Sequence, residues 1–70
     1  MKWTVSIQFN RVLAYHNFMS LLNRNLIKDT KRINYDVNLL IVEFETTTEP
    51  NKEVIKKWKN VIDVKIVEVK

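Results

Sequence analysis

The chain has 70 residues, with no cysteine, no glycine and a single histidine. This length allows one domain, which we expect to span residues 1–70. Without cysteine the chain has no disulfide and no thiolate zinc site, and one histidine leaves a protein-only metal site short of nitrogen ligands. The absence of glycine excludes the glycine-rich phosphate-binding loops, whose close backbone approach needs a residue without Cβ. We therefore expect no cofactor and no metal.

Lysine and arginine together number 12, against 8 aspartate and glutamate residues, so the formal net charge is +4. This excess permits contact with nucleic acid without requiring it. No apolar stretch reaches the roughly 18 residues of a membrane helix. The first nine residues alternate between polar and apolar side chains, unlike the apolar block of a signal peptide. We therefore expect a cytoplasmic protein that does not bind a membrane.

The spacing of apolar residues changes after residue 9, and this change predicts a strand followed by a helix. Residues 2–9 alternate with period two, which predicts a strand with one buried face formed by Trp3, Val5, Ile7 and Phe9. From Val12 onward the apolar residues recur every three or four positions, which predicts an amphipathic helix near 11–25. We expect Asn10 to cap its start and Asn25 to cap its end.

The middle of the chain is expected to contain two strands. A polar segment predicts a short edge strand near 31–36, and a second strong strand follows near 39–46, with a core face of Leu40, Val42 and Phe44. The apolar phase slips by one residue between Val37 and Leu40, which indicates a turn or a bulge. A hairpin and one long bulged strand over 33–46 are the two alternatives.

The last third predicts a helix and a strand. Pro50 suits the first position of a helix near 50–59, and Asn60 is expected to end it. The buried stripe of this helix is Val54, Ile55 and Trp58. Residues 61–69 alternate again, with Ile62, Val64 and Ile66 expected on the core face.

The predicted order is therefore β-α-β-β-α-β. In a chain of this length it indicates an α+β domain with the ferredoxin-like split βαβ arrangement. Each helix has one apolar stripe, so both helices are expected to pack on one face of an antiparallel sheet and to leave the other face open.

No set of residues predicts catalysis. His16 is the one candidate general base, and neither a nucleophile nor an acid partner is identified for it, since Ser20 is only its neighbour one helical turn away. Glu43 and Glu45 lie two residues apart on an exposed strand face, without a third ligand for a metal. We therefore expect a non-enzymatic protein with no small-molecule ligand. An active site shared between subunits is the least supported hypothesis.

A protein-binding surface is the leading functional hypothesis. We expect the first and third strands to be parallel neighbours, with the last strand antiparallel on the other side of the first. This arrangement places apolar side chains around Thr4 on the open face, namely Leu39, Ile41, Val67 and Val69. The alternative is a bulge that returns Val67 and Val69 to the core. The hypothesis predicts a small accessory protein that forms a homodimer, or that binds and modulates a larger protein, through its open sheet face.

A nucleic-acid-associated protein is the second functional hypothesis. One basic group comprises Arg24, Lys28, Lys31 and Arg32, and the other, on the second helix, comprises Lys52, Lys56, Lys57 and Lys59. Such groups bind phosphate by charge, with an affinity that falls as salt rises. RNA-binding sheets of this topology stack bases on aromatic residues of the open face. Here Trp3, Phe9 and Phe44 are all in phase with the core, which disfavours such binding.

Overall fold

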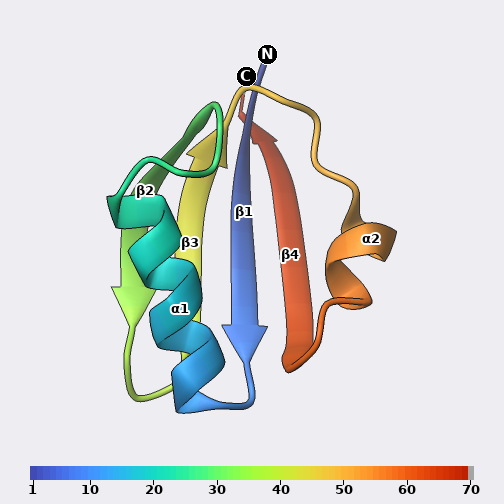
Figure 1. The fold of residues 1–70 in the computed structure, drawn as a ribbon. Coiled ribbons are helices and arrows are strands. Elements are labelled where there is room, and N and C mark those ends of the chain that lie inside the picture. Colours follow the sequence, from blue (N-terminus) through green and yellow to red (C-terminus); the bar gives the residue numbers. More distant parts are fainter. Residues whose placement is uncertain (70) are drawn as a thin grey trace.

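The computed structural model describes residues 1–69. The elements in chain order are β1 (Lys2–Phe9), α1 (Val12–Asn23), β2 (Thr30–Asp36), β3 (Ile41–Thr46), α2 (Lys52–Lys56) and β4 (Val61–Val69) (Figure 1). The predicted β-α-β-β-α-β order is confirmed, and so is the short edge strand. The four strands form one antiparallel sheet in the order β2-β3-β1-β4.

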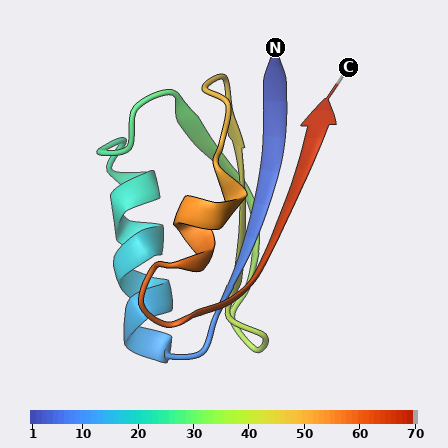
Figure 2. The same ribbon diagram turned by 90° about the vertical axis from the view of Figure 1, so that its right-hand side faces the viewer.

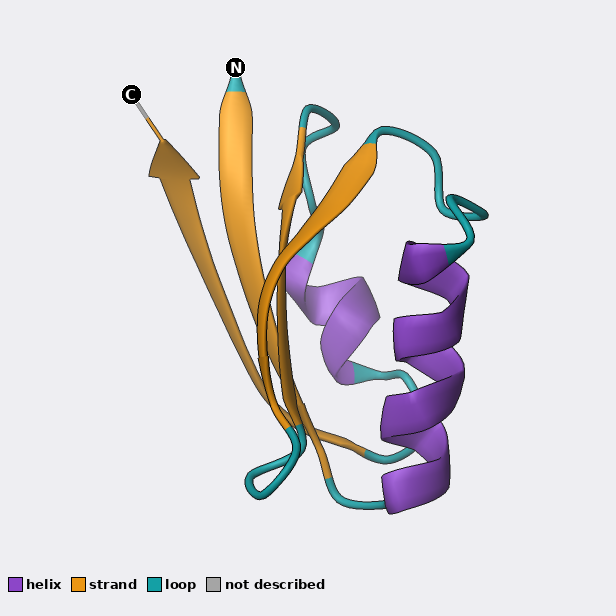
Figure 3. Cartoon of the chain, turned by 90° about the vertical axis from the view of Figure 1, so that its left-hand side faces the viewer, coloured by secondary structure: helices purple, strands orange, loops and turns teal. Residues whose placement is uncertain are grey.

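Both helices lie on the same side of this sheet, and its other face is open (Figures 2 and 3). The core lies between the two layers. The inward faces of β1 and β3 supply its centre, as their period predicted, and Tyr15 is its largest fully buried side chain. The buried apolar residues of the core are Val5, Ile7, Phe9, Tyr15, Phe18, Leu22, Val42, Phe44, Ile55 and Val64.

The direction of β3 corrects one expectation. β3 runs antiparallel to β1, with Val5 opposite Phe44 and Ile7 opposite Val42. The expected parallel pairing of these strands was wrong. The helical crossover through α1 returns β2 parallel to β1, and the following hairpin then reverses the chain. The start of β3 therefore lies beside the end of β1, and this separates residues that were expected to meet.

The connection between β2 and β3 is a tight hairpin over residues 37–40. A carboxylate oxygen of Asp36 accepts hydrogen bonds from the backbone N–H groups of Asn38 at 2.9 Å and Leu39 at 3.2 Å. Leu40 then takes the left-handed conformation, with φ of 57°. The phase slip in the sequence is therefore a turn, and the alternative of one long bulged strand is wrong.

Two bulges change which side chains face the core. In β4, Asp63 pairs with Gln8 and Val61 with Phe9, so Ile62 has no direct partner. Ile62 is consequently exposed, and its predicted place in the core was wrong, while Val61 packs against the core. In β2 the register shifts between Arg32 and Asn34, which leaves Ile33 as the additional residue. Each bulge bends its strand and interrupts the pairing with the neighbouring strand at that one position.

The residues that cap the two ends of α1 were predicted only in part. Arg11, rather than Asn10, occupies the N-cap position, and its side chain makes no capping hydrogen bond. At the other end Asn25 adopts φ of 56°, and the N–H of Leu26 donates to the carbonyl of Leu21 at 3.0 Å. This is the Schellman arrangement that closes many helices, with asparagine in the left-handed position that glycine usually occupies. The C-cap itself is Arg24, and the predicted cap, Asn25, occupies the left-handed position that follows it.

The second helix, α2, is much shorter than expected. The side chain of Asn51 accepts from the N–H of Val54 at 3.2 Å, so the helix begins one residue after this cap and two after Pro50. The expectation that Pro50 opens the helix was wrong. Near its end the N–H of Trp58 bonds to the carbonyl three residues earlier, at Ile55, which tightens and terminates the last turn. Asn60 follows with φ of 71° and leads the chain into β4.

Candidate binding surfaces

The centre of the open sheet face is polar. Residues of β1 that point away from the helices are Lys2, Thr4, Ser6 and Gln8. Lys2 Nζ lies 3.4 Å from Glu45 Oε2, and Asn34 Nδ2 donates to Glu43 Oε1 at 3.1 Å. These contacts engage both glutamates that the sequence singled out. This face is therefore polar along β1, and its two glutamates are already partnered.

Three of the five predicted interface residues do lie together. Val67 is opposite Thr4, and Val69 is opposite Lys2, at the end of the sheet where both termini lie (Figure 1). Val67 is 61% exposed, and Val69 is also exposed. The alternative in which a bulge returns these valines to the core is therefore wrong. We call Thr4, Val67 and Val69 the β4 patch.

The other two predicted interface residues lie at the far end of the same face. Ile41 is opposite Gln8, whose side-chain Nε2 donates to the carbonyl of Leu39 at 3.0 Å. Gln8 and Thr4 are four residues apart on β1, which corresponds to about 13 Å along a strand. Because β3 is antiparallel to β1, Leu39 and Ile41 cannot join the β4 patch. The predicted five-residue surface is divided into two.

The basic residues are divided as well. Lys31 is opposite Glu45 on the open face, whereas Arg32 is opposite Phe44 on the helix side. Arg24 ends α1 as its C-cap, and Lys28 lies in the following loop. The lysines of the second group are on α2 and the turn after it, beside β4 at the opposite edge of the sheet (Figure 1): Lys52, Lys56, Lys57 and Lys59. The two groups thus form no continuous basic surface.

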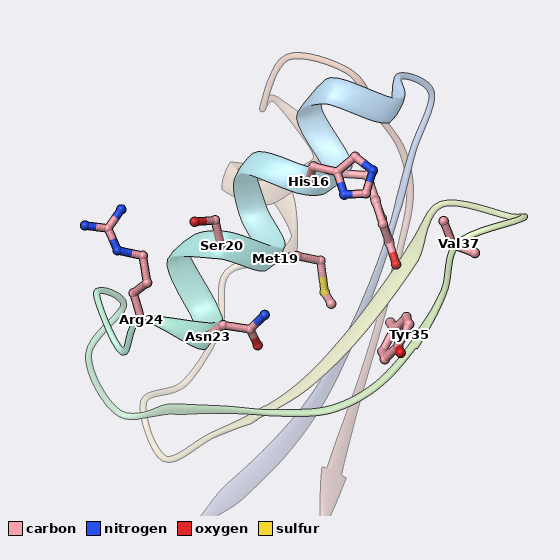
Figure 4. Close-up of a pocket in the computed structure, with 8 residues that line it drawn as sticks. His16, Met19, Ser20, Asn23, Arg24, Tyr35 and Val37 are labelled. Atoms are coloured by element: carbon pink, nitrogen blue, oxygen red, sulfur yellow. The ribbon is translucent and has the colours of Figure 1, made fainter.

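A groove between α1 and β2 was not predicted (Figure 4). It has a volume of about 570 Å³, and its lining is more apolar than polar. Eight side chains line it: Tyr15, His16, Met19, Ser20, Asn23, Arg24, Tyr35 and Val37. The sequence held a partial signal, because Tyr35 and Val37 are apolar residues on a strand that is otherwise polar. We call this the α1–β2 groove.

Side chains at the Asn23 end of the groove are held in place. Arg32 Nε donates to Asn23 Oδ1 at 2.9 Å, and the guanidinium carbon lies 4.9 Å from the centroid of the Tyr35 ring. A cation stacked on an aromatic face is attracted by the ring quadrupole. Both contacts restrict the rotamers of Arg32. Its terminal nitrogens keep donors for a further acceptor, because a guanidinium has five N–H groups.

His16, at the other end of the groove, has an aromatic neighbour. Its ring centroid lies 5.2 Å from that of Tyr15, with the planes at 69°. Burial raises the pKa of the Tyr15 phenol, so this group is neutral at physiological pH. The groove therefore combines apolar side chains with neutral polar groups and arginine, and no nucleophile is paired with a base in it.

Within residues 1–69, no group of three or more His, Cys, Asp or Glu side chains is arranged to hold a metal ion. Over the same residues, no helix has the length and apolar character needed to cross a membrane. We found no match to the chain among protein-family models, curated proteins or solved structures. Its function is therefore inferred from its own surfaces.

Proposed function

We propose that this protein is a non-enzymatic protein-binding module, and that the β4 patch is its contact surface. The observation that supports the proposal is the exposure of Val67 and Val69 on a sheet face that no helix covers. The partner is a second copy of the chain or a larger protein whose activity it modulates. The β4 patch lies on an edge strand, since β4 has a neighbour on one side only within residues 1–69.

Two physical arguments favour association at this place. Removing apolar surface from water stabilises a contact by roughly 25 cal/mol per Å². An edge strand also presents unpaired backbone N–H and C=O groups that a second chain can satisfy. A domain of this size buries only about 60% of its unfolded surface, so its core alone provides little stability. Association would add to that stability by burying more apolar surface.

We also propose that the domain is a ferredoxin-like split βαβ fold with a reduced second helix. The element order and the β2-β3-β1-β4 sheet support this assignment, together with the position of both helices on one face. α2 has five residues, and Ile55 is the one buried residue it contributes.

Val67→Lys tests the proposed function. On a free surface a lysine in place of Val67 costs little, whereas in an interface its charge must be desolvated without a partner. The matched control is Ile62→Lys, because Ile62 is also on β4 and 57% exposed, but lies at the opposite end of the strand. We expect the wild type to sediment as a dimer at high concentration, Val67→Lys as a monomer, and Ile62→Lys as the wild type does.

A wild type that stays monomeric at millimolar concentration would exclude self-association and restrict the proposal to a larger partner. The proposal fails if Val67→Lys unfolds the chain, because Val67 would then belong to the core. Circular dichroism measured beside the sedimentation separates these results.

Nucleic-acid binding is the second candidate function. Among residues 1–69 the one ion pair is Lys2–Glu45, so the cations of α2 and of the α1–β2 connection have no carboxylate partner. Replacement of Lys56, Lys57 and Lys59 by glutamate should abolish any binding that depends on α2. Binding of this kind weakens steeply as salt increases. If neither duplex nor single-stranded nucleic acid, DNA or RNA, is retained at low salt, this candidate is excluded.

A further inference from the structure

We propose that the α1–β2 groove is a second binding site, which takes an extended peptide with an acidic group at its carboxyl-terminal end. This site is separate from the β4 patch, because β2 and β4 are the two opposite edges of the sheet. Three independent features of the chain support it: the free edge of β2, the apolar groove beside that edge, and the unpaired cations at one end of the groove.

The first feature is the free edge. β2 pairs with β3 on one side and has no strand on the other within residues 1–69. Figure 3 looks onto this edge, and α1 stands beside β2 without covering it. An extended peptide can add to such an edge through main-chain hydrogen bonds, and its alternate side chains then enter whatever pocket flanks the strand.

The second feature is the composition of the flanking pocket. Met19 extends from α1 towards the side of the groove formed by Tyr35 and Val37 (Figure 4). Met19 is partly buried, and Tyr35 is 52% exposed although it faces the helix layer. A flexible thioether beside an aromatic ring adapts to apolar side chains of different shapes. The middle of the α1–β2 groove therefore suits one apolar side chain of the peptide.

The third feature is charge. Arg24 lines the groove next to Asn23, with its guanidinium directed away from Tyr35 and Val37 (Figure 4). Arg32 contacts the same end of the groove through its hydrogen bond to Asn23. Neither arginine makes an ion pair with residues 1–69. Arg32 is already held by Asn23 and Tyr35, so little side-chain entropy is lost when it binds a further acceptor. A carboxylate is the acceptor that a guanidinium binds best, through two parallel hydrogen bonds.

The dimensions and the strand direction define the peptide. His16 and Asn23 mark the two ends of the groove on α1 and are separated by seven helical positions, or about 10 Å. About three residues of extended chain cover this length. The basic end lies at the start of β2, so a peptide antiparallel to β2 brings its carboxyl-terminal end to Arg24 and Arg32. Antiparallel pairing is also slightly more stable than parallel pairing.

The test begins with the intact chain and a displayed library of random heptapeptides with free carboxyl termini. We expect the selected sequences to carry Asp, Glu or the terminal carboxylate next to an apolar residue. A synthetic peptide of the selected sequence is then titrated into ¹⁵N-labelled protein. Amide signals of β2 and of residues 16–24 should shift, while those of Thr4 and Val67 should not.

Arg32→Met and its neighbour Lys31→Met form the matched pair of variants. Both remove one positive charge from β2, but Arg32 is on the groove side and Lys31 is on the open face. Loss of a charge-assisted hydrogen bond weakens binding about tenfold, so we expect that loss for Arg32→Met and less than about a twofold change for Lys31→Met. Arg24→Met, at an exposed position, is the second variant in case Arg32→Met does not fold.

Three results would overturn the proposal. The first is a selection that enriches no sequence. The second is a selected peptide that binds Arg32→Met and Arg24→Met as tightly as the wild type, or that shifts the Thr4 and Val67 signals instead. The third is an oligothymidylate that shifts the same β2 and α1 signals at lower concentration than any peptide, since the groove would then bind nucleic acid. None of these results affects the β4 patch, whose test uses Val67.

Discussion

The aromatic rings of Phe18 and Trp58 lie 5.8 Å apart between centroids, with their planes tilted by 51°. Phe18 belongs to α1, and Trp58 to the turn that follows α2, so this contact connects the two helical parts of the molecule. Phe18 also contacts the ring of Phe44 on β3 at 5.7 Å. The aromatic contact partly compensates for the short α2, which contributes little buried surface of its own.

Trp58→Ala should therefore destabilise the fold by about 2 kcal/mol, less than for a fully buried tryptophan, because Trp58 is 40% exposed. Urea unfolding followed by circular dichroism measures this change. Val54→Ala, at an exposed position on α2, is the control and should change the stability by about 0.5 kcal/mol or less. Equal effects of the two changes would show that the Phe18–Trp58 contact contributes nothing.

A second prediction concerns Asn60, whose φ of 71° is unfavourable for a residue with a Cβ. Asn60→Ala should cost about 1 kcal/mol, because alanine tolerates the left-handed region less well than asparagine does. Asn60→Gly should be neutral or stabilising, since glycine adopts this conformation without steric cost. Thermal unfolding of both variants tests the prediction, which is contradicted if Asn60→Ala matches the wild type.

The bulge in β4 leads to a third prediction. Ile62→Lys should change the stability by about 0.5 kcal/mol or less, because the bulge directs this side chain to solvent. Val64→Lys, two residues later, should unfold the chain, because it would bury an unpaired charge in the core. Urea denaturation of both variants measures the difference. If Ile62→Lys also unfolds the chain, the strand has no bulge and Ile62 is in the core.

The fourth prediction concerns alkaline pH. Burial raises the pKa of the Tyr15 phenol above its usual value of 10.0, Tyr35 and Asp36 raise it further, and Arg32 lowers it. The unfolded chain thus releases this proton at a lower pH than the folded chain. The resulting stability is fully present below about pH 10 and is lost as the pH rises through the folded pKa.

The unfolding free energy of the wild type should consequently fall more steeply above about pH 10 than that of Tyr15→Phe, which lacks the ionisable group. Urea unfolding measured in steps from about pH 8 to about pH 11 tests this difference. Parallel curves over the whole range would mean that Tyr15 ionises equally easily in both states.

The candidate sites were less predictable than the fold, and the reasons can be traced to particular residues. Thr4, Val67 and Val69 were correctly placed side by side because each lies in the polar phase of its strand, and their pairing follows from the antiparallel contact of β4 with β1. Leu39 and Ile41 were misplaced because β3 was predicted to run parallel to β1, whereas it runs antiparallel. The α1–β2 groove was missed because it depends on the distance between α1 and the edge strand β2. That distance cannot be predicted from a local sequence pattern.

The sequence by itself determined the elements whose signal is local. Period two over residues 2–9 and 41–46 selects one buried face for each strand, and the three-and-four spacing of α1 places Tyr15, Phe18 and Leu22 in the core. Among residues 1–69 the left-handed positions are Asn25, Asp29, Leu40 and Asn60, and three of these four carry the short polar side chains that tolerate this conformation best.

Only the tertiary structure decided the bulges at Ile33 and Ile62, the early end of α2 and the opening between α1 and β2. A bulge depends on the register with the partner strand. Polar and apolar residues alternate on both sides of the additional residue, so the alternation alone does not show where the bulge lies. The length of a short helix and the distance between packed layers likewise depend on contacts between residues far apart in the chain, such as Phe18 with Trp58.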